Sequence, residues 1–199
     1  LTPEKTNHAL GVIERNAKLQ VQLIDDLLDV SRILRGKLSL EKAPVSLAPT
    51  IIAAIETVQL PAEAKAIAIK TQLPAEPITV IGDTARLQQI IWNLLSNAVK
   101  FTPEGGQITI SLAVVPLASS LAAQIEVIDT GKGIQPDFLP YVFERFRQED
   151  YSITRKFGGL GLGTAIVQQL VTGHGGTIQV TSPGADQGTT FTIHIPLRE

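Results

Sequence analysis

Residues 125–134 read Ile-Glu-Val-Ile-Asp-Thr-Gly-Lys-Gly-Ile, and this stretch decides how the rest of the chain is interpreted. An apolar run typical of a buried strand ends in a carboxylate, Asp129, which two glycines follow. Such a carboxylate can accept a hydrogen bond from an exocyclic amine such as that of adenine. Gly131 and Gly133 lack a Cβ atom, so a flat ring can approach their backbone closely. A tight acidic turn after a strand is the simpler explanation when the stretch is taken alone.

A second group of polar residues lies on a helix that we expect to begin at Asp83 and to reach about Val99. Asn93, Asn97 and Lys100 are spaced i, i+4 and i+7, which places them on one face of that helix. Asparagine is a poor helix former, so two of them in one row need a reason. Amide oxygens suit Mg²⁺ as ligands, and Lys100 can neutralise phosphate. A solvated polar face accounts for the same residues about as well.

A glycine-rich loop at residues 157–164, Phe-Gly-Gly-Leu-Gly-Leu-Gly-Thr, leads directly into another expected helix. Four glycines in six residues, placed just before a well-formed helix, are hard to explain as flexibility alone. Free backbone amides and the positive end of the helix dipole make such a helix start an anion site. The motif G-x-x-x-x-G-K-[ST] is absent, which excludes a P-loop, and the glycine spacing disfavours a dinucleotide-binding fold.

The remaining pattern mixes helices with strands that follow one another in sequence. Strands are expected at 37–41, 66–73, 78–81, 107–115, 123–128, 177–181 and 189–195, and helices at 47–60, 83–99, 136–146 and 163–172. Phe143 and Phe146 are expected to anchor in the core the segment that precedes a polar loop. This order of elements predicts the α+β class, as a two-layer α/β sandwich in which helices cover one face of a single mixed sheet.

The first segment predicts one long helix, which Thr2 can cap and Gly36 can end. Its residues alternate in steps of three and four, as in a heptad seam. The seam runs through Leu10, Ile13, Ala17, Gln20, Ile24, Leu27, Ser31 and Leu34. The apolar stripe is wider than a two-stranded seam needs, so further helices must come from another chain or from residues outside this sequence. We therefore divide the chain into 1–35 and 36–199.

Composition limits the kinds of partner that this chain can have. Its 199 residues include 17 Lys and Arg against 19 Asp and Glu, so no general field attracts nucleic acid or an anionic membrane. The lack of cysteine excludes disulfides and is typical of a reducing compartment. The longest apolar stretch, 112–123, is too short to cross a bilayer. We expect this segment to lie in the cytoplasm and to contact neither nucleic acid nor a membrane. The same expectation holds for an intact protein that is anchored in a membrane.

Taken together and in this order, the motifs resemble those of one protein family. They are the paired asparagines, the Asp-x-Gly-x-Gly turn, the two phenylalanines, the glycine loop and Gly188-Thr-Thr-Phe191 before the last expected strand. The set resembles the histidine-kinase branch of the Bergerat-fold (GHKL) ATPases, whose other members include gyrase and mismatch-repair ATPases. The resemblance covers the chain from about Gly36 to its end. The preceding helix, with Leu-Ile-Asp-Asp-Leu-Leu-Asp-Val-Ser at 23–31, resembles the second helix of the family's dimerisation and phosphotransfer domain.

The resemblance assigns residues of this chain to an ATP and Mg²⁺ site. It implies that Asn97 is the Mg²⁺ ligand, that Asn93 lies near the phosphates, and that Asp129 accepts a hydrogen bond from the adenine amine. Lys100 is implied as a phosphate or ribose contact. Residues 147–156 are implied as the ATP lid, although solvated charges on a loop explain its basic residues as well. The other implied nucleotide contacts are Phe101, Gly131, Gly133, Ile134, Gln148, Arg155, Lys156, Gly159, Gly161, Leu162, Gly163 and Thr189.

The residue at position 93 bears on the reaction that the resemblance implies. Related ATPases carry at this place a glutamate that activates water, whereas the carboxamide of Asn93 cannot act as a base. We therefore expect slow hydrolysis and transfer of the γ-phosphate to a histidine, with Asn93 and Lys100 as catalytic residues. The family's acceptor pattern, H-E-x-x-[TN]-P, does not fit His8, His174 or His194. The acceptor is expected on a first helix outside this sequence, so the chain alone should not autophosphorylate.

The same resemblance implies partners and leaves alternatives open. The expected partners are the phosphoacceptor helix of the same or a partner protomer, a response-regulator receiver domain, and a second copy in a homodimer. The chain contains no methionine, which suits a piece of a longer protein. An alternative function is an ATP-responsive binding or dimerisation module without transfer activity, and an acceptor helix upstream would argue against it. A gyrase-type ATPase is a weaker alternative, because Asn93 replaces glutamate and a kinase-like helix precedes the domain.

Overall fold

The computed structural model describes residues 2–36, 39–117, 120–149 and 160–197. Five strands form one mixed sheet, in which β2 runs parallel to β4 and the other neighbours are antiparallel. Their order is β2 (Ala68–Gln72), β4 (Gln107–Leu117), β5 (Ser120–Asp129), β7 (Thr189–Pro196) and β6 (Thr177–Thr181). The α+β class and the mixed sheet are therefore confirmed.

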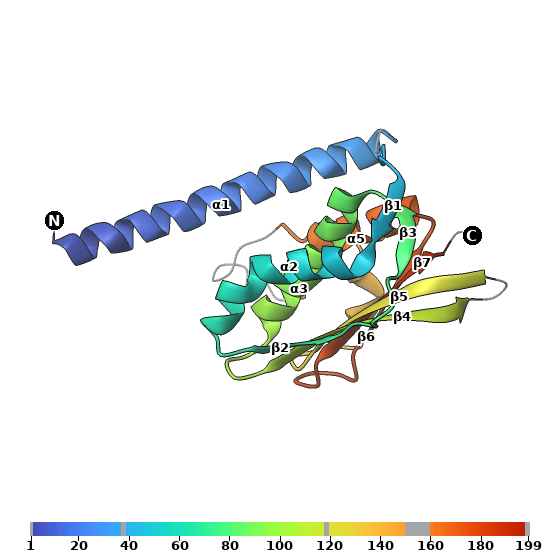
Figure 1. Cartoon of the computed structure of the whole chain (residues 1–199). Helices are drawn as coiled ribbons and strands as arrows, with labels where there is room; N and C mark the ends of the chain where they lie inside the picture. The colour runs from blue at the N-terminus through green and yellow to red at the C-terminus, as the bar shows by residue number, and fades with distance from the viewer. Residues whose placement is uncertain (1, 37–38, 118–119, 150–159, 198–199) are drawn as a thin grey trace.

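Three helices cover one face of this sheet (Figure 1), and they are α2 (Leu47–Glu63), α3 (Thr84–Phe101) and α5 (Gly163–Gly173). Alternate residues of β7 are buried, as expected for a strand with one face against the core. The centre of the core comes from α3, through Leu87, Ile90, Ile91, Leu94 and Leu95, each at most 1% exposed. Burial of each such side chain contributes about 1.5–3 kcal/mol. The apolar face of α3 thus fixes the position of its polar face.

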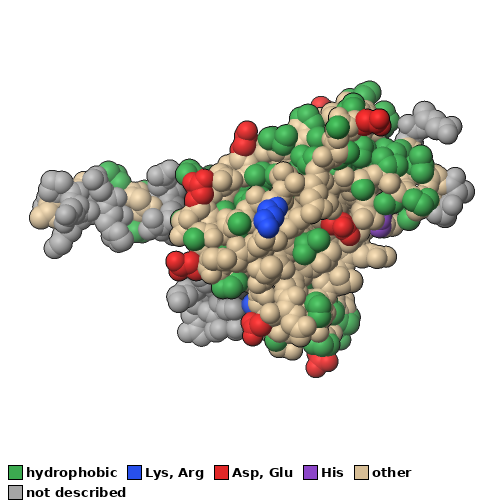
Figure 2. Space-filling view, turned by 60° about the horizontal axis from the view of Figure 1, so that its bottom comes forward, with side chains coloured by type: hydrophobic (Ala, Val, Ile, Leu, Met, Phe, Trp, Pro, Cys, Tyr) green, Lys and Arg blue, Asp and Glu red, His purple; other side chains and the backbone are tan. Residues whose placement is uncertain are grey.

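Among the described residues, no helix covers the opposite face of the sheet (Figure 1). Figure 2 looks toward this side and shows few, scattered charged side chains. Glu126 of β5 lies on this face, because its neighbours Ile125 and Val127 are buried against the helices. The carboxylate of Glu126 accepts hydrogen bonds from the hydroxyl groups of Ser111 and Thr192.

The N-terminal helix, α1 (Pro3–Leu34), is continuous and projects past the rest of the chain (Figure 1). Gly36 follows it with φ +61°, a left-handed conformation that ends the helix as predicted. The apolar seam residues Leu10, Ile13, Ile24, Leu27 and Leu34 are 55–65% exposed. None of the helices in the described ranges is long and apolar enough to cross a membrane.

The helix that carries the paired asparagines begins as the sequence predicts. Asp83 caps α3 by accepting a hydrogen bond from the amide of Arg86 at 3.1 Å. The amide of Asp83 donates to Nε2 of His174 at 3.0 Å, and Nδ1 of His174 lies 2.7 Å from the carbonyl oxygen of Leu170. His174 is 6% exposed, so it joins the start of α3 to the end of α5 from inside the structure.

The strand expected at 37–41 was placed wrongly. Residues 39–42 are not extended in a sheet, and residues 37 and 38 lie outside the described ranges. The strand is instead β1 (Ala43–Ser46), which pairs antiparallel with β3 (Thr79–Gly82) in a separate two-stranded sheet. The single sheet that the sequence predicted is therefore accompanied by a second, smaller one. Residues 43–46 form the strand because they pair with the distant strand β3, which the local alternation of apolar residues does not reveal.

The helix expected over residues 136–146 was also wrong. It is reduced to a single 3₁₀ turn, η1 (Leu139–Tyr141). Pro140 explains the difference, because in the interior of a longer helix it would lack an amide donor and clash with the preceding turn. Phe146 was predicted to anchor this segment in the core, yet it is 58% exposed. Phe143 is half-buried and packs against the core as predicted.

Candidate functional site

Asp129 ends β5 inside the structure, where it is 8% exposed. Its Oδ1 accepts a hydrogen bond from the amide of Gly131 at 2.8 Å, and the amide of Thr189 also donates to the carboxylate. Thr189 is the register partner of Asp129 on β7 and is itself buried. Burial raises the pKa of the Asp129 carboxyl group, and the two backbone hydrogen bonds partly oppose that rise. The result is an oriented, partly desolvated acceptor.

The two glycines after Asp129 are required by the protein's own backbone. A Cβ atom at Gly131 would lie 2.6 Å from Oδ1 of Asp129 and 2.8 Å from the carbonyl oxygen of Phe101. Gly133 has φ +66°, and a Cβ atom there would lie 2.0 Å from the carbonyl oxygen of Gly184. From the sequence, we interpreted the two glycines as room for a flat ring. The structure shows that the turn itself requires glycine at both positions, with or without a ligand. This packing fixes the turn relative to Asp129.

Asn93, Asn97 and Lys100 lie along α3 at the predicted helical spacing. Asn93 is 7% exposed, and its Nδ2 donates to the carbonyl oxygen of Gln89 at 3.1 Å. Its Oδ1 faces the start of α5, since a Cβ atom on Gly163 would lie only 3.1 Å from it. Asn97 is half-buried. The asparagine motif and the glycine-loop motif, far apart in sequence, therefore meet at the first residue of α5.

Two lysines gather at one aromatic ring at the end of α3. The Nζ atoms of Lys100 and Lys132 lie 5.0 and 4.9 Å from the centroid of Phe101. Burial lowers the pKa of Lys100, and the positive charge of Lys132 lowers it further. Lys132 also forms a 3.1 Å ion pair with Glu149. Sequence reasoning missed Lys132 and Glu149, and the available signal was the place of Lys132 between the two glycines of the turn.

The end of α3 is tied to the turn that follows Asp129. The carbonyl oxygen of Phe101 accepts a hydrogen bond from the amide of Lys132 at 3.2 Å. Nζ of Lys65 lies 2.6 Å from the carbonyl oxygen of Val99 and contacts two further carbonyl groups at this helix end. These donors satisfy groups that a helix terminus leaves unpaired. The polar face of α3 and the turn after Asp129 are thus parts of one hydrogen-bonded unit.

The described part of the glycine loop packs against the segment that precedes the predicted lid. Gly161 has φ +68°, and its carbonyl oxygen accepts a hydrogen bond from the amide of Phe146 at 3.0 Å. A Cβ atom on Gly161 would lie 3.1 Å from Cγ of Gln148, so the glycine loop also touches the first residues of the predicted lid. Leu162 is 1% exposed, which places its side chain in the core. Any ligand contact at position 162 is therefore to the backbone.

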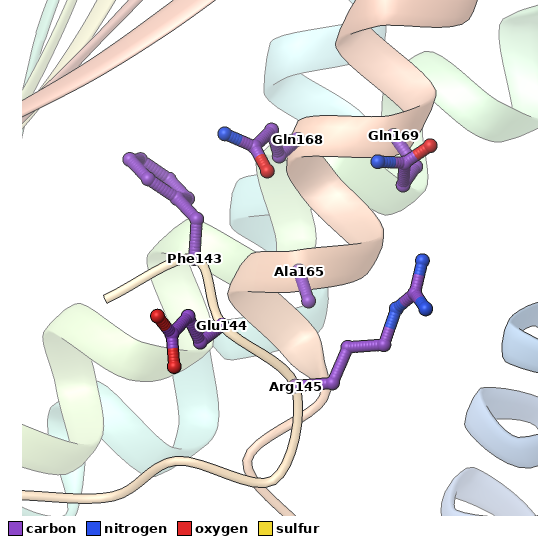
Figure 3. Close-up of a pocket in the computed structure, with 6 residues that line it drawn as sticks. All are labelled: Phe143, Glu144, Arg145, Ala165, Gln168 and Gln169. Atoms are coloured by element: carbon purple, nitrogen blue, oxygen red, sulfur yellow. The ribbon is translucent and has the colours of Figure 1, made fainter. Parts of the chain in front are cut away.

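The remaining predicted contacts are Ile134 and three residues outside the described ranges. Arg155, Lys156 and Gly159 are outside the described ranges. Ile134 is half-buried against the core, and its amide donates to Oγ of Ser182 at 2.9 Å. Figure 3 shows a groove between α5 and the segment that precedes the glycine loop, lined by Phe143, Glu144, Arg145, Ala165, Gln168 and Gln169. None of the predicted site residues lines this groove, so it is a separate surface.

Comparisons with known proteins identify the family of this chain. The family described as histidine kinase-, DNA gyrase B-, and HSP90-like ATPase matches residues 82–199. The chain is 39% identical to the hybrid signal transduction histidine kinase D of Dictyostelium discoideum, over 94% of this chain and 14% of that protein. It is also 39% identical to the signal transduction histidine-protein kinase BarA of Escherichia coli (strain K12), over 99% of this chain and 21% of that protein.

A solved structure shares the fold over almost the whole chain. The crystal structure of full-length ShkA in complex with AMPPNP matches with a TM-score of 0.79 and 31% identity, over 98% of this chain and 39% of that one. The chain spans 14–21% of the length of the two curated relatives above. The resemblance of the ATPase part to this family is confirmed, whereas the interpretation of the first helix stays a prediction. The chain therefore belongs to the histidine kinase-, DNA gyrase B-, and HSP90-like ATPase family, and the curated relatives named above are histidine kinases.

Proposed function

We propose that residues 36–199 bind Mg²⁺-ATP and transfer its γ-phosphate to a histidine, and that residues 1–35 are the second helix of a dimerisation and phosphotransfer domain. The observation that carries the proposal is the approach of Oδ1 of Asn93 to the first residue of α5, Gly163. It joins the amide face of α3 to the positive end of a helix, which favours a bound anion. The complex of ShkA with AMPPNP, an ATP analogue, supports this choice of nucleotide.

Asp129 is proposed to accept a hydrogen bond from the adenine amine. Its carboxylate is buried and already oriented by the amides of Gly131 and Thr189, so binding the base needs little rearrangement. Phe101 lies beside this turn, and we propose that its ring flanks the base. The other proposed base contacts are Gly131, Gly133, Ile134 and Thr189.

The proposed phosphate end combines the start of α5 with the polar face of α3. Lys100 is partly desolvated, which strengthens its attraction to phosphate. Oδ1 of Asn93 is directed at the start of α5. The backbone at Gly161, Leu162 and Gly163 is proposed to add amide donors. Further phosphate or metal contacts are proposed for Gln148, Arg155, Lys156 and Gly159.

Asn97 is proposed to ligate Mg²⁺ through its amide oxygen. Within the described ranges, no group of three or more His, Cys, Asp or Glu side chains is placed to hold a metal. Mg²⁺ commonly combines few protein ligands with water and substrate phosphates, so these residues fit the metal only together with nucleotide. When bound, the metal neutralises phosphate charge.

Asn93 favours transfer over hydrolysis. Its carboxamide does not take up a proton at neutral pH, so it can orient a group but cannot activate water. The γ-phosphate is then kept for a histidine nitrogen, through positioning and charge neutralisation. Both ring nitrogens of His174 are engaged within the fold, and Nε2 of His194 contacts Gln124 at 2.9 Å. The acceptor is therefore proposed on the phosphoacceptor helix of the same or a partner protomer.

The intact protein is proposed to be a homodimer that passes phosphate to a response-regulator receiver domain. The seam of α1 exposes large apolar side chains over most of its length, which suits pairing with a second copy. The relatives named above are signal transduction kinases, and one is a hybrid kinase. We place this part of the protein in the cytoplasm.

A labelling experiment tests the transfer step. An extended chain that includes the preceding acceptor helix should be labelled by γ-labelled ATP, whereas the chain of 199 residues alone should stay unlabelled. The extended chain with its acceptor histidine changed to alanine is the matched control. If a dimeric extended chain binds ATP but takes up no label, the chain is instead an ATP-responsive binding or dimerisation module.

A further inference from the structure

One buried carboxylate on α1 has no part in the site described above. Asp29 is 4% exposed, although it lies on a helix whose apolar seam faces solvent. Nη1 of Arg86 donates to both its oxygens, at 3.0 and 2.8 Å, and Nε2 of Gln89 donates to its Oδ2 at 2.8 Å. Nη1 of Arg86 also donates to Oε1 of Gln89 at 2.7 Å. These three side chains form a closed cluster between α1 and α3.

The cluster is confined to one turn of α1. Asp25, one turn earlier, is exposed, and Arg32 comes only within 3.8 Å of Asp29. The next residue, Val30, is 4% exposed and Ile33 packs on the core, so this turn of α1 is docked. The side chain of Asp29 is 5% exposed and that of Arg86 is 21% exposed. Without Arg86, the buried carboxylate of Asp29 would lose its compensating charge. The cluster therefore stabilises the docked position of α1 relative to a released one.

Hydrogen bonds continue from this cluster to the nucleotide-facing side of α3. The side chain of Gln89 binds Asp29, and its backbone carbonyl oxygen accepts a hydrogen bond from Nδ2 of Asn93 at 3.1 Å. That bond leaves Oδ1 of Asn93 directed at the start of α5. Gln89 thus links Asp29, through its side chain, to Asn93, through its backbone.

We propose that Asp29, Arg86 and Gln89 form a latch through which docking of α1 positions Asn93 for nucleotide. Asp29 is a positioning residue, because it touches no proposed ligand and acts through α3. Coupling between two sites is reciprocal, so the docked helix raises nucleotide affinity and bound nucleotide tightens the docking. The coupling rests on the proposed function, whereas the latch itself can be measured without nucleotide.

The first arm of the experiment measures docking alone. The chain has no cysteine, so Ile13→Cys on α1 and Lys70→Cys on β2, both exposed positions, can carry spin labels for a distance measurement. Asp29→Asn removes the charge and keeps the shape, and Asp25→Asn on the same helix is the matched control. We expect the released population to be at least about tenfold higher in Asp29→Asn than in the control. Arg86→Gln, which removes the other charge, provides the second variant.

The second arm uses Mg²⁺-AMPPNP as the probe. Asp29→Asn should bind it at least about fivefold more weakly than Asp25→Asn, and the probe should narrow the distance distribution of the labelled parent chain. Unchanged distances in both Asp29→Asn and Arg86→Gln overturn the latch. A released helix with unchanged affinity overturns the coupling to Asn93. If the parent chain binds no AMPPNP, the proposed nucleotide site fails, and the distance arm still decides the latch.

Discussion

Nζ of Lys65 lies 2.6 Å from the carbonyl oxygen of Val99, and it also contacts the carbonyl oxygens of Lys100 and Thr102. Lys65 follows α2, so it reaches across to cap the end of the helix that carries both asparagines. An ammonium group there satisfies unpaired carbonyl groups and offsets the negative end of the helix dipole. Lys65 therefore helps to hold the side chains of the candidate site at the C-terminal end of α3.

Lys65→Met should lower the free energy of unfolding by about 1–3 kcal/mol, because a charged donor is lost from several carbonyl groups. Lys65→Arg should restore part of this loss. Denaturant unfolding measures both effects. The control is Lys70→Met, at an exposed lysine on β2, which should change the free energy by less than about 0.5 kcal/mol. Equal effects of the two methionine substitutions would show that Lys65 does not hold the helix end.

Acid should weaken the fold through His174. Burial is the main cause that lowers the pKa of its ring, so the unfolded chain takes up a proton below about pH 6.5 that the folded chain resists. The contribution of His174 to the free energy of unfolding is therefore complete above about pH 7 and falls as the pH drops toward 5.

Urea unfolding at several pH values measures this slope. His194→Gln should keep it, and His174→Gln should remove most of it. The raised pKa of Asp129 has the opposite effect on the free energy of unfolding, because acid protonates its carboxyl group more readily in the folded chain than in the unfolded chain. This effect is common to both histidine variants, so the two are compared with each other. Equal slopes in both variants would refute the role of His174.

Gly133→Ala should destabilise the chain far more than Gly105→Ala. Both glycines have a left-handed conformation, with φ +66° and +76°, so both substitutions carry a similar backbone strain of about 1–2 kcal/mol. Only at Gly133 would the new Cβ atom collide with another backbone, that of Gly184, whereas Gly105 faces open space. Calorimetric melting temperatures compare the two variants. A similar loss in both would mean that the turn after Asp129 can relax.

Asn97→Ala should reduce the effect of Mg²⁺ on nucleotide affinity. In the parent chain, AMPPNP should bind more tightly with Mg²⁺ than without it. Loss of the amide ligand should lower the affinity for Mg²⁺ at least about tenfold. Ser96→Ala, at the neighbouring half-buried position, is the control and should keep the full Mg²⁺ effect. Calorimetry with and without Mg²⁺ decides this, and an undiminished Mg²⁺ effect in Asn97→Ala would remove Asn97 from the metal site.

Local signals were sufficient to predict the elements that carry the site. The helix predicted to begin after Asp83 is α3, because a capping residue and an apolar stripe with helical spacing act within a few residues of each other. The strand ending at Asp129 was likewise recognised from its apolar run and the glycines that follow. Its hairpin with β4 extends further than predicted, to the pairing of Leu117 with Ser120, because strand length depends on the partner strand.

Contacts between distant elements could not be predicted from one sequence. Asp29 belongs to an acidic stretch that suits a solvated helix, and only docking against α3 buries it while Asp25 stays exposed. Phe146 is apolar by type, yet the loop geometry leaves it at the surface. The burial of Asp29 and the exposure of Phe146 both follow from tertiary packing, which periodicity and composition do not encode.

Calorimetric titration of Mg²⁺-AMPPNP into Asp129→Asn tests the base pocket on which the whole account depends. Loss of a charged acceptor for the adenine amine should weaken binding at least about tenfold relative to the parent chain. Glu126→Gln, on the same strand but on the opposite face of the sheet, should bind like the parent chain. Unchanged affinity in Asp129→Asn, or an equal loss in both variants, would contradict the account.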